Sequence, residues 1–403
     1  MDANQPHDVV VLGGGISGAS FAFQAARAGR RVLVLDADER PGGCLRTERS
    51  GSGFWFELGA HTLYNSYGAT LELIEAAGSL DVLQERGKPV LRFLDGNRVR
   101  KGKNLGLLLR LFRLGELLRC VPRWRKAKPA GHSVRSHYSR LVGPTNYENV
   151  LGPLLSAVPS QRADDFPADM LFKKRERRED VMRSFTLKGG VERLVELALA
   201  HPGIEARCGC AATSVERAAD GFAVVLADGT RIAAPVLAVA TPPRTAGELL
   251  AGAFPQLAAE LAGLAQTEIE SLGLALRAER VDVPYATFLI PRGDRFHSVV
   301  TRDVVADPER RAFTFHFRAG TGRDAAVARA CEVLGVAADA FEAVAWKRSV
   351  LPSPVLGHAE VVARVDAALE GGALALTGNW FGGLSIEDCV LRSRAEWQRV
   401  EAL

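Results

Sequence analysis

The feature that most constrains the fold is a glycine-rich turn near the start of the chain. Four apolar residues, Val9–Leu12, run into Gly13, Gly15 and Gly18, which have the spacing G-x-G-x-x-G. The apolar run predicts a strand that is buried on both faces. The three glycines allow a tight turn, close approach of a pyrophosphate and close packing of the next helix. The spacing therefore predicts a dinucleotide-binding turn at which a helix amino terminus faces the phosphates.

The residues after the turn extend this prediction to a complete nucleotide-binding unit. A helix over residues 19–28, a stop at Gly29 and a strand over residues 31–35 are followed by Asp36. A carboxylate about 20 residues after the glycines accepts hydrogen bonds from a ribose 2′-hydroxyl. The same carboxylate would repel a 2′-phosphate, so we expect NADP to be disfavoured. These residues alone leave NAD and FAD equally open.

The composition excludes several classes of function. The chain has 403 residues and a net charge of +4, and it contains no basic tail that would indicate nucleic-acid binding. The first residues are polar and no apolar run reaches the ~18 residues of a membrane span, so we expect a cytoplasmic protein. The six cysteines form no C-x-x-C pair and the histidines lack ligand spacing. We therefore expect neither disulfides nor a metal site.

Two further segments combine glycine with polar residues. The first has Arg40, Gly42 and Gly43 directly after the acidic strand end, and the second is the run Gly59 to Thr62 around His61. Paired glycines let backbone approach a ligand, and an arginine can neutralise phosphate charge. A surface loop explains the first segment equally well, and a histidine such as His61 is more often structural. The position of His61 after two cofactor-like segments makes it a site candidate.

The stretch from Leu105 to Lys128 is both leucine-rich and basic. Its leucines alternate with arginines and lysines in the pattern of a basic amphipathic helix. Such a helix can lie at the surface of an anionic membrane. The alternative is a helix packed on its own domain with a solvated basic face.

The rest of the chain predicts a return to the nucleotide domain and a second sheet. A strand–helix pattern over residues 184–200 is followed by a three-stranded meander within residues 212–234 and a buried strand over 236–240. Strands such as 271–277 and 312–317 indicate a separate sheet that could form a substrate wall. The chain ends with a strand over 373–377, a glycine-rich loop, and a helix capped by Ser385 whose positive end would face that loop.

Taken together, these segments resemble the flavin amine oxidase and protoporphyrinogen oxidase superfamily, most closely the protoporphyrinogen oxidase branch. The first family fingerprint is similar to residues 13–18 with Asp36, Arg40, Gly42 and Gly43. The mid-chain and closing signatures are similar to residues 185–194 and to Gly378, Asn379, Gly383, Asp388 and Cys389. The branch is indicated by Trp346 followed by Pro352, Gly357 and His358.

The resemblance implies FAD as the cofactor and an α/β fold with three parts. A Rossmann-type FAD-binding domain is assembled from residues 1–85, 184–245 and 345–403. Residues 86–183 form a helical insertion that faces a membrane or caps the substrate, and residues 246–344 form a mixed-sheet substrate domain. The implied cofactor-binding residues are Gly13, Gly14, Gly15, Ile16, Ser17, Gly18, Asp36, Ala37, Arg40, Gly42, Gly43, Cys44, Arg46, Gly59, Ala60, His61, Thr62, Val215, Trp346, Gly378, Asn379, Leu384, Ser385 and Ile386.

The expected activity is removal of hydride from a C–H bond of a hydrophobic or cyclic small molecule. His61 is the single candidate catalytic residue, as a polar group near the flavin ring. Cys44 and the pair Ala60–His61 depart from residues common in amine oxidases, which puts the substrate in doubt but not the cofactor. An isoprenoid desaturase, an amine oxidase, a non-redox sugar mutase and a flavin-dependent regulatory protein stay open as alternatives, as does the oligomeric state.

Overall fold

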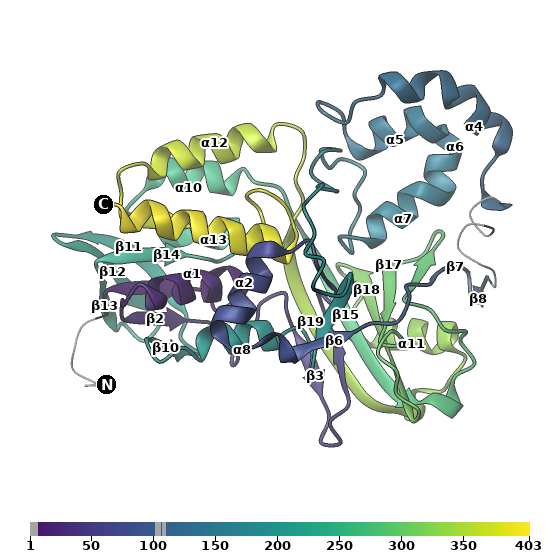
Figure 1. Ribbon diagram of the computed structural model, residues 1–403, viewed down its shortest axis with the longest axis horizontal. Coiled ribbons are helices and arrows are strands. Elements are labelled where there is room, and N and C mark those ends of the chain that lie inside the picture. The colour runs from purple at the N-terminus through teal and green to yellow at the C-terminus, as the bar shows by residue number, and fades with distance from the viewer. Residues whose placement is uncertain (1–6, 101–105, 107–109) are drawn as a thin grey trace.

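The computed structural model describes residues 7–100, 106 and 110–403. Figure 1 shows a nucleotide-type domain, a second sheet and a lobe of short helices. The strands are β1 (Val9–Leu12), β2 (Val32–Leu35), β3 (Thr47–Arg49), β4 (Trp55–Glu57), β5 (Leu63–Tyr64), β6 (Leu83–Glu85), β7 (Leu91–Asp95), β8 (Arg98–Val99), β9 (Ser184–Leu187), β10 (Ile204–Arg207), β11 (Ala212–Ala218), β12 (Gly221–Leu226), β13 (Arg231–Ala234), β14 (Val236–Val239), β15 (Gln266–Arg277), β16 (Phe288–Pro291), β17 (Phe296–Thr301), β18 (Arg310–Arg318), β19 (Phe341–Pro352) and β20 (Leu374–Leu376). The helices are α1 (Ile16–Arg27), α2 (Gly68–Ala77), α4 (Leu114–Cys120), α5 (Val134–Val142), α6 (Pro144–Asn146), α7 (Gly152–Ala157), α8 (Arg193–Leu199), α9 (Pro243–Leu250), α10 (Pro255–Ala262), α11 (Arg323–Leu334), α12 (His358–Leu369) and α13 (Ile386–Glu401), with short turns η1 (Leu80–Val82), η2 (Val121–Lys126), η3 (Tyr147–Leu151), η4 (Ala278–Arg280) and η5 (Ala338–Ala340).

The nucleotide-type domain is built on a five-stranded parallel sheet with the order β10-β2-β1-β14-β20. Its strands come from the first, middle and last parts of the chain, as expected for a domain assembled from discontinuous segments. The apolar run Val9–Leu12 is the central strand β1 and is fully buried. The edge strand β10 has mostly exposed polar residues, which is why the sequence pattern gave no signal for it.

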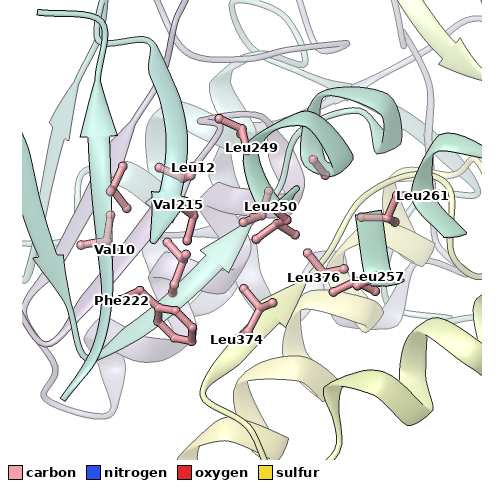
Figure 2. Close-up of a cluster of buried hydrophobic side chains, with 14 of the residues drawn as sticks. Val10, Leu12, Val215, Phe222, Leu249, Leu250, Leu257, Leu261, Leu374 and Leu376 are labelled. Carbon is pink, nitrogen blue, oxygen red and sulfur yellow. The ribbon is translucent and has the colours of Figure 1, made fainter. Parts of the chain in front are cut away.

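Both faces of this sheet are covered, because alternate residues of β1 point to opposite sides. Val9 and Val11 pack with α1 and with Trp397 of α13. Val10 and Leu12 pack on the other face with the β11–β13 meander and with leucines of α9 and α10. Figure 2 shows this cluster, with Val215, Phe222 and Leu250 among its labelled side chains. These two cores hold the carboxyl edge of the sheet, where the glycine turn lies, in a fixed position.

The second sheet has seven strands in the order β19-β15-β18-β17-β16-β7-β8. One face packs against α11, through Leu272, Phe313 and Phe315 among others. The strands β7 and β8 come from the segment that the sequence pattern assigned to a helical insertion, and β7 pairs in parallel with β16. The start of that segment therefore extends the second sheet, and helices follow only afterwards.

The strand at residues 184–187 also differs from its expected place. It forms β9 between β5 and β6 in a separate small sheet and does not join the parallel sheet. The two-stranded hairpin β3–β4 projects toward the second sheet, where the Thr314 hydroxyl donates to the Glu57 carbonyl at 2.6 Å. These small units connect the two large sheets.

The helices α4 to α7 form a lobe next to the second sheet (Figure 1). The single helix expected over residues 105–128 is not observed in the part of it that the structure describes; residues 105 and 107–109 lie outside that part. The described part is interrupted at Arg113, whose backbone is extended and whose N–H donates to the Asn146 side chain at 2.7 Å. The Asn146 amide donates back to the Arg113 carbonyl at 3.1 Å. This exchange makes α4 a separate short helix that starts at Leu114.

Candidate active site

The glycine turn has the geometry that its sequence predicts. The Gly13 N–H donates to the Leu35 carbonyl at 2.8 Å, and Gly13 has a φ of +101°, which favours glycine. A Cβ on Gly18 would lie 1.9 Å from the Gly13 carbonyl oxygen, so this position requires glycine for close packing of helix and turn. The helix α1 begins at Ile16, and Ile16 and Ser17 are buried behind the turn.

Asp36 lies at the end of β2 and is tied to the turn. One carboxylate oxygen accepts the Gly14 N–H at 2.6 Å and the other accepts the Asp38 N–H at 2.8 Å. A carboxylate has about four lone-pair sites, so two remain for ribose hydroxyls. The exposed Ala37 follows, and the segment that leads from β10 into β11 lies alongside, since the Cys210 N–H donates to the Asp36 carbonyl at 2.8 Å. Val215 of β11 has its side chain in the core beneath.

A second backbone segment lies against the turn without intervening side chains. Gly15 and Gly42 form a parallel bridge, and the Gly42 N–H donates to the Gly14 carbonyl at 3.0 Å. A Cβ on Gly43 would lie 3.3 Å from the Gly15 Cα, and the φ of Gly43 is +57°. Gly15 and Gly43 keep partial exposure whereas Gly14 and Gly42 are buried. The two segments thus form a bare cradle that fits an extended dinucleotide.

The arginines near this cradle are engaged with carboxylates. The Arg46 guanidinium lies 3.4 Å from Asp38 and 3.8 Å from the buried Glu192, and Arg40 pairs with Glu48. Glu192 also accepts the Thr47 N–H at 2.9 Å. Arg40 and Arg46 therefore hold the loop in shape, and their charges are already balanced by neighbouring acids.

The segment from Gly59 to Thr62 lies next to Cys44, at the end of the second backbone segment of the cradle. The Ala60 N–H donates to the Cys44 carbonyl at 3.3 Å, and Cys44, Gly59, Ala60 and Thr62 all keep partial exposure. Burial raises the pKa of the Cys44 thiol, which stays protonated and does not act as a nucleophile. Together with Gly15 and Gly43, these residues form a partly exposed strip along the surface, which we call the cofactor strip.

His61 is held at the far end of this strip. Its Nδ1 lies 3.3 Å from the Gly59 carbonyl, and its ring packs edge-on against Phe288 of the second sheet with centroids 5.2 Å apart. Burial, helped by the nearby Arg86 charge, lowers the pKa of His61 to about 3. The imidazole is therefore neutral near pH 7 and can donate or accept one hydrogen bond, but it carries no charge.

The end of the chain closes the site from the other side. Ser385 caps α13: its hydroxyl accepts the Asp388 N–H at 3.2 Å, and the Asp388 carboxylate accepts the Ser385 N–H at 3.3 Å. Asp388 also binds Arg175 at 2.7 Å and Lys173 at 2.9 Å. Ile386 is buried at the first helical position, and Leu384 packs on the helical lobe. Gly378 and the partly exposed Asn379 lie in the loop that follows β20.

Comparisons with known proteins agree with this geometry. Residues 11–76 match the model of an NAD(P)-binding Rossmann-like domain. A protein from Exiguobacterium sp. 255-15, provisionally named protoporphyrinogen oxidase, is similar in structure with a TM-score of 0.79 and 19% identity, over 98% of both chains. Reduced UDP-galactopyranose mutase is similar with a TM-score of 0.76 and 13% identity, over 98% of this chain and 96% of that one. The chain therefore shares the fold of these two proteins.

The curated sequence relatives cover less of the chain than the solved structures do. A protein of Dictyostelium discoideum, provisionally named flavin-containing monoamine oxidase A, is 31% identical over 145 residues, which are 34% of this chain and 31% of that protein. The chain thus matches less than a third of the length of the first curated relatives.

One predicted cofactor residue lies away from the strip. Trp346 pairs with Leu272 in the β15–β19 register and packs on the core next to α11. Its neighbour Lys347 points the other way, and its ammonium donates to the Gly43 carbonyl at 2.8 Å. Sequence reasoning missed Lys347, because the alternation of partly exposed and exposed residues along the edge strand β19 is interrupted at Ala345, Trp346 and Lys347, which are all partly exposed. Burial lowers the pKa of Lys347.

The described residues contain no group of three or more histidine, cysteine or acidic side chains placed to hold a metal ion. Among the helices that the structure describes, none has both the length and the apolar character needed to cross a bilayer.

Proposed function

We propose that this protein is an FAD-dependent oxidoreductase that removes hydride from a C–H bond of a hydrophobic or cyclic substrate. The observation that carries the proposal is the bare contact between Gly15 and Gly43, at which two backbone segments meet with no side chain between them and the Asp36 carboxylate stands at one end. Residues 13–18, 36–37, 42–46, 59–62 and 378–386 would hold the cofactor. FAD, when bound, supplies the hydride acceptor.

The chain's own residues would prepare the surroundings of the ring. The amino terminus of α13, fixed by the Ser385–Asp388 capping box, directs positive potential toward the loop that precedes it, which favours negative charge there. His61 is neutral and is held by Gly59 and Phe288, so its role is to orient substrate or ring by a hydrogen bond. A general base is not needed for hydride removal if the substrate proton leaves to solvent.

The walls beyond His61 support an apolar substrate. Phe288 and Ile290 of β16 pack with Phe93 of β7 and with Val150 and Ala157 of the helical lobe. This apolar cluster lies between the second sheet and the lobe, on the side of the sheet that carries the His61 contact. The surroundings of the His61 contact are thus apolar, and we propose that the part of the substrate near His61 is a hydrophobic ring system.

A cavity of about 600 Å³ beside this cluster supports a substrate that also carries ionised groups. It lies between α7 and β17–β18 and is lined by Arg318, His297 and Asp164 among others. Asp164 is paired with Arg135 and Arg162, and no described carboxylate lies within ion-pairing distance of Arg318. Glu148, Glu268 and Asp294 also line this cavity. We propose that Arg318, the lining arginine without a paired acid among the described residues, binds a carboxylate of a protoporphyrinogen-like substrate.

The test is anaerobic reduction of the flavin in the purified protein. We expect a carboxylated tetrapyrrole such as protoporphyrinogen to bleach the bound flavin within seconds, and amines and polyenes to do so slowly or not at all. Bleaching by amines or polyenes alone would assign an amine oxidase or a desaturase. Turnover of a nucleotide sugar only by the pre-reduced protein would assign a mutase and overturn the proposal.

We also propose that the surface of α4 and η2 contacts an anionic bilayer. Leu118 is 69% exposed, Leu114 55% and Trp124 49%, and the adjacent Arg119 and Arg123 are exposed. Exposed apolar side chains with cations beside them fit the interface of anionic lipid. We expect the chain to sediment with phosphatidylserine vesicles, and we expect the Leu118→Asp variant to stay in the supernatant. Equal sedimentation of this variant would refute the proposal, and Arg244→Gln on the opposite domain is the control.

A further inference from the structure

A small cavity lies next to His61. Its volume is about 20 Å³, which is room for one species of about the size of water. It is bounded by β4, by β17 and β18 and by the residues around Arg86 and Thr186. His61 is the single predicted site residue among those that line it, so the cavity is separate from the cradle at Gly15 and Gly43.

Several donors around this cavity have no partner. Arg86 Nε and Nη2, Arg302 Nε and the Thr186 hydroxyl are buried and make no hydrogen bond to any described group. Thr186 is only 1% exposed. The Arg302 guanidinium is fixed, because it lies over the rings of Phe54 and Trp55 at 4.4 and 4.7 Å and its Nη1 donates to the Val305 carbonyl at 2.9 Å. Buried donors without acceptors cost about 1–3 kcal/mol each, more when charged.

The charges around the cavity do not balance. Among the described residues, neither Arg86 nor Arg302 lies within ion-pairing distance of a carboxylate. The one acid on the cavity wall is Glu57, whose oxygens accept the Val191 N–H and the Thr47 hydroxyl, both at 2.7 Å. Burial raises the pKa of Glu57 to about 8, and His61 is neutral. Near pH 7 the wall therefore has two positive charges and no full negative charge.

We propose that this cavity binds a small monovalent anion of halide size, held by Arg86, Arg302 and the Thr186 hydroxyl. A water molecule accepts at most two hydrogen bonds, whereas three unpartnered N–H positions and a hydroxyl line this cavity. An anion accepts all of them and neutralises one of the two buried guanidinium charges. The site would place a negative charge close to the His61 ring, which lines the same cavity.

The direct test uses crystals of the full chain, as purified, soaked in sodium bromide. We expect an anomalous bromide peak inside the cavity, in contact with both guanidinium groups. A cavity that holds only water, with no anomalous peak while bromide binds elsewhere on the surface, would overturn the proposal. Because this readout involves no turnover, its failure and the failure of the proposed oxidoreductase activity are distinguishable.

A solution test compares thermal unfolding in sodium chloride and in sodium gluconate at equal ionic strength. At tenfold excess over Kd, we expect chloride to raise the midpoint of the parent chain by about 1–2 °C. Thr186→Val, which keeps the shape and removes one donor, and Arg86→Gln should reduce this shift by at least half. Arg244→Gln removes an exposed charge and should keep the full shift. Equal shifts in all four proteins would overturn the proposal.

Discussion

Replacement of Gly18 by Ala tests whether the turn is as tightly packed as the structure indicates. The new Cβ would lie 1.9 Å from the Gly13 carbonyl oxygen, against a minimum of 3.0 Å for real Cβ contacts, so the carbonyl must move by at least 1.1 Å (3.0 − 1.9). The Gly13 backbone cannot move easily, because its N–H donates to the Leu35 carbonyl and a Cβ on its Cα would lie 2.9 Å from the Ala240 carbonyl oxygen. The displaced backbone is the part of the turn that would face the pyrophosphate.

Two opposing effects set the magnitude. Ala is favoured over Gly in a helix by about 1 kcal/mol, and Gly18 lies in the first turn of α1. Forced overpacking costs about 1–3 kcal/mol, so we expect the free energy of unfolding to fall by up to about 2 kcal/mol. We expect the affinity for FAD to fall at least about tenfold, which corresponds to about 1.4 kcal/mol.

The assay is a fluorescence titration of the flavin-free protein with FAD, together with urea unfolding of the same sample. Gly68→Ala is the matched control, because Gly68 also begins a helix but a Cβ there meets nothing within 4 Å. The control should bind FAD as the parent does and unfold no more easily. A Gly18→Ala variant that binds FAD within a factor of two of the control would refute the packing argument.

Three further predictions concern the polar groups of the site. Folded Glu57 keeps its proton to about pH 8, whereas an unfolded glutamate releases it near pH 4.5, so the free energy of unfolding should fall by a few kcal/mol as the pH rises between these values. The Glu57→Gln variant should flatten this pH dependence in a series of urea unfolding curves. An unchanged pH dependence would count against the raised pKa of Glu57. The His61→Ala variant should reduce its flavin more slowly under anaerobic conditions and should keep its FAD; loss of FAD instead would make His61 structural. Because the pKa of His61 is about 3, the reduction rate of the parent protein should show no ionisation of this residue between pH 5 and 8. Ser385→Ala removes the cap of α13 and should lower the free energy of unfolding by about 1 kcal/mol in urea titrations, with Ser52→Ala in an exposed loop expected to have no effect.

The parts of the fold that the sequence predicted are those fixed by neighbouring residues. The turn from Gly13 to Gly18 needs only local sterics, so strand, turn, helix and Asp36 followed from the pattern. The same holds for the capping box, in which Ser385 and Asp388 are three residues apart. Glycine spacing and capping are chemistry within one helical turn, and tertiary contacts add to them without overriding them.

The parts that the sequence missed depend on residues far along the chain. The basic stretch is divided at Arg113 because Asn146, which is 33 positions later, bonds its backbone on both sides. Lys347, and not the predicted Trp346, lies next to Gly43, because the β15–β19 register decides which side chain faces Gly43. Neither the hydrogen bonds to Asn146 nor this register can be predicted from the local pattern of hydrophobic residues.

The contribution of α13 has a consequence for how the protein is made. Its Glu387 carboxylate accepts the N–H groups of Ala69 and Thr70 at 2.9 Å, and its Ser393 hydroxyl donates to the Ser17 carbonyl at 2.8 Å. A nascent chain that still has this helix inside the ribosomal tunnel therefore exposes the start of α2 and one side of α1. The nucleotide domain is complete only after α13 has left the tunnel, so FAD capture should follow the emergence of this helix, and a ribosome-bound chain arrested before residue 386 should stay flavin-free.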